Sequence, residues 1–196
     1  MKIEQICEQY NIENYTINPD GSIDVYGNVR LVNKKLTELP LTFNKVHGNF
    51  ECDINNLTTL KGSPKWTSGN FESSNNDLTD LIGSPEIVEG NFQSVGNRLT
   101  DLTGSPKQVD GWFNVGSNKQ LRSINGCSEK IGKEFYCFNT PLESIFTNVD
   151  QHFLYAFNFY KIVKDNTVNL KRLKYVMDLY DLPIDLDKIQ KYYQIC

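Results

Sequence analysis

The chain has 196 residues, of which 39% are hydrophobic and 22% charged, and its formal net charge is −4. This composition is typical of a soluble folded protein rather than a disordered one, and a negative chain without clustered Lys and Arg argues against nucleic acid as a partner. No stretch approaches the roughly 18 apolar residues of a membrane span. Glu4 and Glu8 fall where a signal peptide would have its apolar run, so we expect a cytoplasmic protein.

Five cysteines are present, and their odd number and irregular spacing do not fit a disulfide framework or a CxxC zinc site. We expect reduced thiols, as in a cytosol. The cysteines are Cys7, Cys52, Cys127, Cys137 and Cys196.

Residues 1–26 are predicted to form an N-terminal cap. Apolar side chains recur at helical spacing over residues 2–11, which indicates a short amphipathic helix. Two strand-like runs then flank Asn18-Pro19-Asp20-Gly21, a sequence typical of a tight turn, so we expect a hairpin. A repeat array needs such a cap because its terminal unit would otherwise expose an apolar face.

A repeat with a period of about 21 residues fills the middle of the chain and predicts a solenoid. The units are GNFECDINNLTTLKGSPKWTS, GNFESSNNDLTDLIGSPEIVE and GNFQSVGNRLTDLTGSPKQVD, which begin at Gly48, Gly69 and Gly90. Alignment on the aromatic residue extends the array back to Val29 and forward, with one extra residue in the last step, to Phe135. The solenoid is therefore expected to span residues 27–146 in about six units, each of roughly 21–22 residues, with short parallel strands.

Within each unit the pattern F-x-C/S-x-x-N-x-L-x-x-L has a physical explanation. Phe50 and Cys52 alternate with Glu51 and Asp53, which predicts a strand with the first pair inside and the second pair outside. A recurring Asn at the following bend can satisfy backbone groups of the turn, and stacked units would form an Asn ladder. Its members are Asn55, Asn76, Asn97 and Asn118, with Lys34 and Thr140 in the same place in the end units.

The return side of each unit is predicted to be loop or 3₁₀ turn. Gly-Ser-Pro recurs there at 62–64, 83–85 and 104–106, and Pro cannot continue a helix. Val46, Val88, Val109 and Ile131 then bring the chain back into the core, with Thr67 as the weakest member.

Residues 147–196 lose the period and are predicted to be a helical unit on the open C-terminal end of the solenoid. The stretch 148–163 is rich in aromatic residues, and 167–180 has apolar residues at helical spacing with Asn166 or Thr167 as N-cap. Pro183 ends that run, and Asp185 or Asp187 could begin a last short helix that carries Ile189, Tyr192 and Tyr193.

Two resemblances follow from these residues. The repeat is similar to the leucine-rich-repeat core L-x-L-x-x-N-x-L. Together with the flanking segments NYTINPDGSIDV and FYKIVKDNTVNLKRLKYVMDLY, it resembles leucine-rich-repeat-like proteins encoded by large tailed bacteriophages. The resemblance covers nearly the whole chain and implies a phage protein made in the cytoplasm of an infected bacterial cell. It supplies no catalytic residues.

No residue pattern points to catalysis, a cofactor or a metal. A Cys–His nucleophile pair needs contact and an orienting third group, whereas Cys52 and Cys137 fall at interior positions and His47 and His152 are isolated. The Gly-Ser-Pro loops lack the GxxxxGK[ST] pattern of a phosphate-binding loop. Cys127 replaces the Ser of a Gly-Ser-Pro turn and could be exposed, but a reactive thiol also needs a lowered pKa.

The outward strand face is the candidate binding surface, because solenoids usually bind partners there. Its aromatic residues near the C-terminal end are candidate hot spots, although they could instead lie under the helical unit. Glu51 and Glu72 side by side could bind a cation or a basic partner, but a solvated pair is the favoured interpretation. The candidate residues are Trp112, Asn114, Tyr136, Phe138, Glu51, Asp53, Glu72 and Gln93.

The sequence thus predicts a protein–protein interaction module rather than an enzyme. The expected partner is a host or viral protein, and inhibition of a host defence protein is suggested by the resemblance alone. The alternative is a structural or accessory viral protein that self-associates into a homo-oligomer through its aromatic C-terminal region. Neither nucleic acid nor membrane is an expected partner.

Overall fold

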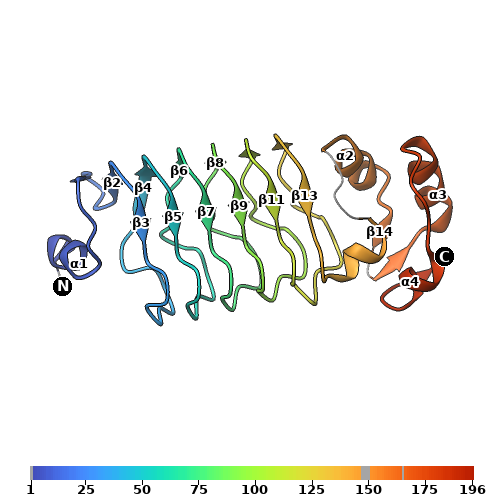
Figure 1. The fold of residues 1–196 in the computed structure, drawn as a ribbon, viewed down its shortest axis with the longest axis horizontal. Coiled ribbons are helices and arrows are strands. Elements are labelled where there is room, and N and C mark those ends of the chain that lie inside the picture. The colour runs from blue at the N-terminus through green and yellow to red at the C-terminus, as the bar shows by residue number, and fades with distance from the viewer. Residues whose placement is uncertain (1, 147–150, 165) are drawn as a thin grey trace.

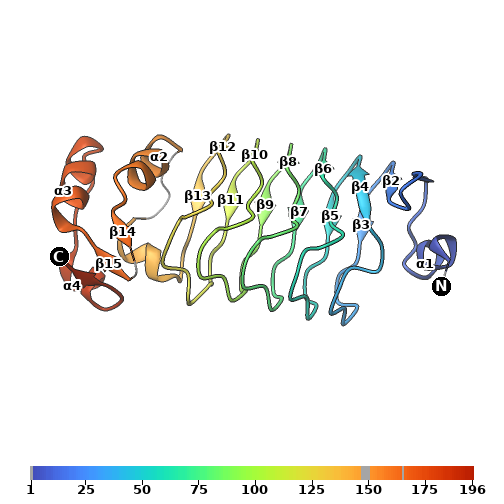
Figure 2. The same cartoon turned by 180° about the vertical axis from the view of Figure 1, so that it is seen from behind.

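The protein is an elongated β-solenoid of about five turns that ends in a small unit of short helices (Figures 1 and 2). The computed structural model describes residues 2–146, 151–164 and 166–196. Each turn of the solenoid, here called a coil, contributes one strand to each of two parallel sheets, and the third side of the coil is an irregular loop.

The first sheet, called sheet A, has seven strands in the order β1-β2-β4-β6-β8-β10-β12. From β4 on, its strands are parallel and in register, with Lys45 opposite Trp66 and Trp66 opposite Ile87. Its strands are β1 (Tyr15–Ile17), β2 (Ile23–Val25), β4 (Phe43–Val46), β6 (Trp66–Thr67), β8 (Ile87–Val88), β10 (Gln108–Val109) and β12 (Lys130–Ile131).

The second sheet, called sheet B, has six parallel strands in the order β13-β11-β9-β7-β5-β3. It contains the strand that the sequence pattern predicts in each unit. Its strands are β3 (Val29–Arg30), β5 (Phe50–Glu51), β7 (Phe71–Glu72), β9 (Phe92–Gln93), β11 (Phe113–Asn114) and β13 (Phe135–Tyr136).

Sheet A is the main difference from the expected fold. The sequence predicts only that the chain returns into the core at Val46, Val88, Val109 and Ile131, whereas each of these residues ends a short strand. The sequence signal is weak because β6, β8, β10 and β12 have only two residues each, so a single inward residue marks the alternation in each of them. The leucine-rich-repeat assignment, which expects one strand per unit, stays a prediction.

The N-terminal end has the expected helix and hairpin. Helix α1 (Ile3–Gln9) buries Cys7, and Ile12 follows it into the core. Strands β1 and β2 pair antiparallel across the predicted turn, where Gly21 has φ +80°. In both views α1 lies at the end of the solenoid beyond β3 (Figures 1 and 2), so it covers an end that would otherwise expose the core.

A column of stacked phenylalanines forms the centre of the core. Each sheet B strand from β5 to β13 begins with a fully buried Phe, and neighbouring ring centroids are 4.8–5.6 Å apart. This spacing is close to the strand separation, so identical side chains stack from coil to coil. Two columns of buried aliphatic side chains complete the interior: Leu57, Leu78, Leu99 and Leu121, and Leu60, Leu81, Leu102 and Ile124.

The predicted Asn ladder is present and joins consecutive coils. In Asn76 the side-chain nitrogen donates to the carbonyl of Cys52 in the preceding coil at 3.1 Å, and the side-chain oxygen accepts the N–H of Leu57 at 3.0 Å. Asn55, Asn97 and Asn118 make the same pair of contacts one coil apart. Each amide therefore satisfies buried backbone groups that would otherwise cost about 1–3 kcal/mol.

A second Asn ladder lies at the bend between the two sheets, and the sequence analysis missed it. The side-chain oxygen of Asn49 accepts the N–H of Asn70 at 2.9 Å, and Asn28, Asn70 and Asn91 repeat the contact. The Gly before each Asn has a steric reason: a Cβ on Gly90 would lie 2.6 Å from the Asn70 oxygen. The Gly-Asn pair therefore lets the bend of each coil stack directly on the bend of the preceding coil.

The third side of each coil is made of turns, as the sequence predicts. Gly62, Gly83 and Gly104 have φ of +97°, +95° and +88°, a conformation that favours glycine. Among the described residues the one 3₁₀ helix is η1 (Pro141–Ser144), in the last coil.

In its described residues, the C-terminal unit contains three helices and a small three-stranded sheet, and the sequence did not predict the sheet. Thr167 lies in a strand rather than at a helix start, so the N-cap of α3 is Asn169, whose side chain accepts the N–H of Arg172. Asp185 caps α4, and Tyr192 and Tyr193 follow that helix instead of lying in it. The elements are α2 (Gln151–Phe159), β14 (Val163–Lys164), β15 (Thr167–Val168), α3 (Leu170–Leu179), α4 (Leu186–Gln190) and β16 (Gln194–Ile195). Of the predicted 148–163 segment, residues 148–150 lie outside the described residues.

The C-terminal unit docks on the last coils by extending their core. The ring of Phe146 is 6.4 Å from Phe135, the last of the stacked column, and 4.9 Å from Phe157 of α2. The hydroxyl of Tyr193 donates to the carbonyl of Arg122 at 3.0 Å. The Phe column therefore continues into the C-terminal unit.

Candidate binding face

All eight candidate residues lie along sheet B: five in its strands, Trp112 just before β11, and Asp53 and Phe138 two residues after β5 and β13. The inner positions of the same strands hold the Phe column, so strand alternation fixes the outward direction of the candidates. The face divides into a polar part over β5, β7 and β9 and an aromatic part over β11 and β13.

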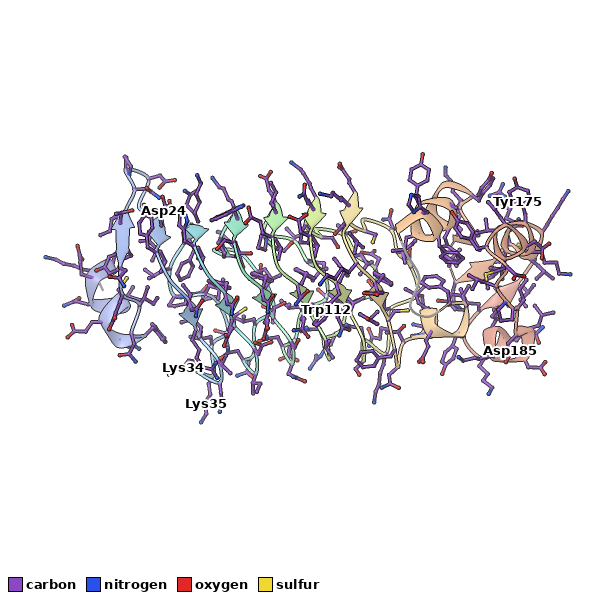
Figure 3. The ribbon with its side chains drawn as sticks, turned by 45° about the horizontal axis from the view of Figure 1, so that its top comes forward. Asp24, Lys34, Lys35, Trp112, Tyr175 and Asp185 are labelled. Carbon is purple, nitrogen blue, oxygen red and sulfur yellow. The ribbon has the colours of Figure 1, made fainter. Side chains whose placement is uncertain are left out.

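The aromatic part is open to solvent. Trp112 is 37% exposed and Phe138 is 40% exposed, whereas Tyr136 is half-buried. The Trp112 and Tyr136 rings meet edge to face with centroids 6.5 Å apart. Trp112 lies on the solenoid, apart from Tyr175 and Asp185 in the C-terminal unit (Figure 3). The helices thus leave Trp112 and Phe138 uncovered.

Local packing holds Phe138 in place. Its ring lies over Gly116 of the preceding coil, so close that a Cβ there would be 2.5 Å from the ring atoms. Asn114, on the strand before that glycine, accepts the N–H of Gly116 with its side-chain oxygen at 3.0 Å. The absence of a side chain at Gly116 thus leaves room for the exposed Phe138 ring to pack there. A ring already fixed in this way loses little conformational entropy when a partner binds.

The polar part is a set of paired side chains. Arg30 forms an ion pair with Glu51 at 2.6 Å, and the Gln93 amide donates to Glu72 at 3.3 Å. Glu51 and Glu72 are in register on adjacent strands, as predicted, but each has its own partner on the side away from the other. Within the described residues no group of three or more His, Cys, Asp or Glu is placed to hold a metal ion.

Asp53 is the residue of the polar part whose ionised form is disfavoured by its surroundings. Burial is the largest cause that raises the pKa of its carboxyl, and the negative charges of Glu72 and Glu51 add to it, whereas the N–H of Ser74 favours the ionised form; the resulting pKa is about 6. That N–H donates to the carboxylate oxygen at 2.6 Å. Asp53 is therefore a coil-to-coil acceptor whose charge is disfavoured by its surroundings.

The outer face of sheet A carries an aromatic row that sequence reasoning missed. Tyr26 and His47 stack with centroids 4.8 Å apart, and His47 meets Trp66 at 5.0 Å. The Trp66 indole N–H donates to Glu89 at 3.2 Å. Recognition of sheet A as a sheet would have revealed this row, because Trp66 then falls at an outward position.

The candidate thiols are unsuited to nucleophilic chemistry. Burial raises the pKa of Cys137 and of Cys127 to about 12, and it raises the pKa of Cys52 well above its usual range. Cys127 is half-buried, and burial is the largest cause of its shift, so its thiolate is disfavoured. The structure does not bring His47 to a thiol; its ring contacts are Tyr26 and Trp66.

Comparisons with models of known families, with curated proteins and with solved structures found no match. The resemblance to leucine-rich-repeat-like phage proteins therefore stays a prediction. In the described part of the chain, no helix is long and apolar enough to cross a membrane.

Proposed function

We propose that this protein is a binding module, not an enzyme, and that it holds a partner protein against the outer face of sheet B. The observation that carries the proposal is the exposed aromatic part of that face, Trp112 with Tyr136 and Phe138, on two adjacent coils. Aromatic side chains dominate protein interface hot spots because they bury large area with few rotatable bonds.

The polar part of the face would form the rim of the interface. Six strands about 4.8 Å apart make a face about 24 Å long, enough for an extended segment or the edge of a domain. The Arg30–Glu51 ion pair and the Gln93–Glu72 hydrogen bond in this part are expected to add specificity but little affinity.

The partner that best fits the resemblance is a host or viral protein in an infected bacterial cytoplasm, and a defence protein of the host is one such target. The leucine-rich-repeat identity and the phage origin belong to this proposal. The high pKa values of the buried thiols support a binding role over a catalytic one.

Affinity capture from host lysate tests the proposal with two pairs of variants. Trp112→Ala/Tyr136→Ala should lose the captured protein, whereas Tyr26→Ala/Ile87→Ala, which removes exposed apolar side chains from sheet A, should retain it. Capture that is equal for both pairs would remove the outer face of sheet B from consideration. The affinity for a purified partner should then fall about tenfold or more in Trp112→Ala/Tyr136→Ala and stay unchanged in the other pair. Truncation of a hot-spot residue costs about 2 kcal/mol or more of binding free energy.

Self-association is the second candidate function. Among the described residues of the C-terminal unit, large exposed side chains include Tyr155 at 71%, Leu179 at 61% and Tyr175 at 54%. Large exposed apolar side chains that gather on one unit favour a contact with another protein or a second copy.

A further inference from the structure

Two segments at opposite ends of the molecule carry opposite charge, although the C-terminal unit as a whole also holds Asp178, Asp181, Asp185 and Asp187. Residues 1–24 hold one basic residue, Lys2, and five acidic ones: Glu4, Glu8, Glu13, Asp20 and Asp24. Residues 160–175 hold one acidic residue, Asp165, and five basic ones: Lys161, Lys164, Lys171, Arg172 and Lys174. Helix α1 lies at one extreme of the solenoid and α3 at the other (Figures 1 and 2). The expectation that the sequence lacks a basic cluster was therefore wrong for this segment.

The acidic end is built on helix α1. Glu4 and Glu8 are one turn apart and therefore share a face, and both are exposed, whereas Cys7 turns into the core. Glu13 is exposed just beyond the helix. The four described ion pairs all join neighbouring coils of the solenoid, so none of them involves these glutamates.

The basic end contains a cavity of about 690 Å³. Arg172 is fixed at its wall because its guanidinium donates to the carbonyl of Tyr160 at 3.2 Å. Tyr160 and Tyr175 meet edge to face with centroids 5.2 Å apart, and Tyr175 reaches the surface. The lining residues are Tyr160, Asn169, Lys171, Arg172, Tyr175 and Cys196.

We propose that the acidic α1 helix of a second copy of this chain docks at the basic, tyrosine-lined cavity beside α3. The complementary charges would orient the two copies head to tail, and the tyrosines would supply apolar contact area. The two contact surfaces are different parts of the molecule, so the contact does not close on itself and generates open chains. This inference specifies the contact for the second candidate function and rests on that function alone.

A single-stranded nucleic acid is the other polyanion that basic and aromatic side chains attract. The acidic helix is favoured because the same chain supplies it at equal concentration.

Sedimentation velocity of the full chain at low and high salt tests the proposal. The screening length falls from about 30 Å near 0.01 M salt to about 8 Å near 0.15 M. We expect concentration-dependent, elongated oligomers at low salt and at least a tenfold weaker association at physiological salt. Monomers at every concentration in low salt would overturn the proposal.

Charge reversal gives the sharper test. Glu4→Lys/Glu8→Lys and Lys171→Glu/Arg172→Glu/Lys174→Glu should each abolish association alone, and an equimolar mixture of the two should restore it. Glu38→Lys/Lys61→Glu, which reverses exposed charges on the loop side, should associate like the wild type. Circular dichroism and melting temperature check that each variant is folded.

Two results would contradict the head-to-tail contact. One is association that persists in both reversal variants; the other is a mixture that stays monomeric although both variants are folded. A monomeric wild type whose Lys171, Arg172 and Lys174 bind a short single-stranded oligonucleotide would assign the cavity to nucleic acid instead. Neither set of reversals touches Trp112 or Tyr136, so failure here is distinguishable from failure of the sheet B proposal.

Discussion

The regular coils and the last two coils share one interior but have different exteriors. Phe71, Phe92, Phe113 and Phe135 are all fully buried in a single stack. Outside, the same strands change from Glu72 and Gln93 to Asn114 and Tyr136. The same residue type therefore recurs where each coil packs on the next, whereas the residue type varies where the chain faces solvent. Recognition is therefore expected where the exterior departs from the period.

Loss of an interior side chain should be the largest effect. Leu78→Ala should lower the free energy of unfolding by about 2–5 kcal/mol, because it opens a cavity between coils. Phe138→Ala, on the exposed part of the last coil, should change stability far less. Denaturant unfolding of both variants measures the contrast, and a near-neutral Leu78→Ala would show that the interior is not continuous.

A substitution in the Asn ladder should have the second-largest effect on stability. Asn76→Ala removes one acceptor and one donor from buried backbone groups of the preceding coil, so a loss of about 1–3 kcal/mol is expected. Asn56→Ala is the matched control, since Asn56 is an exposed neighbour of the ladder. Equal losses in the two variants would mean that the ladder adds nothing beyond the propensity of Asn for the bend.

A methyl group at the bend tests the second ladder. Gly90→Ala would place a Cβ against Asn70, and an overpacked site typically costs about 1–3 kcal/mol. Ser68→Ala, an exposed substitution next to an equivalent bend, should be neutral. Equal melting temperatures for Gly90→Ala and wild type would show that the coils can separate at this corner.

Asp53 should give the smallest effect and a pH dependence of defined sign. Its pKa in the folded protein, about 6, exceeds the ordinary value of 3.8, so the folded state binds the proton more tightly. Stability attributable to Asp53 should therefore fall as pH rises from about 4 to about 6. Asp53→Asn keeps an acceptor for Ser74 and should raise stability at pH 8 by about 1 kcal/mol, after allowance for solvent screening, with no gain at pH 4. A gain at both pH values would assign the effect to packing instead of charge.

The structural features that recur in every unit could be predicted from the sequence, whereas the features that do not recur could not. The Phe column, the Asn55–Asn118 ladder and the glycine turns recur once in every unit, so alignment of the units revealed them. Sheet A was missed because its strands are mostly very short and its outward positions, Lys45, Trp66, Ile87 and Gln108, share no chemistry. The sheet of β14, β15 and β16 was missed because its last strand is distant in sequence from the other two and lies in an aperiodic region.

The sequence was enough to place the candidate residues on the outer face, but not to predict how exposed they are. Alternation alone placed Trp112, Tyr136 and Phe138 on the outer face. Their exposure depends on where the C-terminal unit docks, and that is decided by Phe146 and Tyr193, whose contacts lie outside the repeat. The second Asn ladder was missed because a side chain that bonds the next coil looks, in sequence, like any exposed polar residue.

Tryptophan fluorescence tests most directly whether the partner binds at the aromatic end of sheet B. The chain has two tryptophans, Trp66 on sheet A and Trp112 on sheet B, so Trp66→Phe and Trp112→Phe each leave a single reporter. Addition of the purified partner should protect Trp112 from acrylamide quenching in Trp66→Phe and leave the quenching of Trp66 unchanged in Trp112→Phe. Saturated binding with Trp112 still fully quenchable would contradict the account.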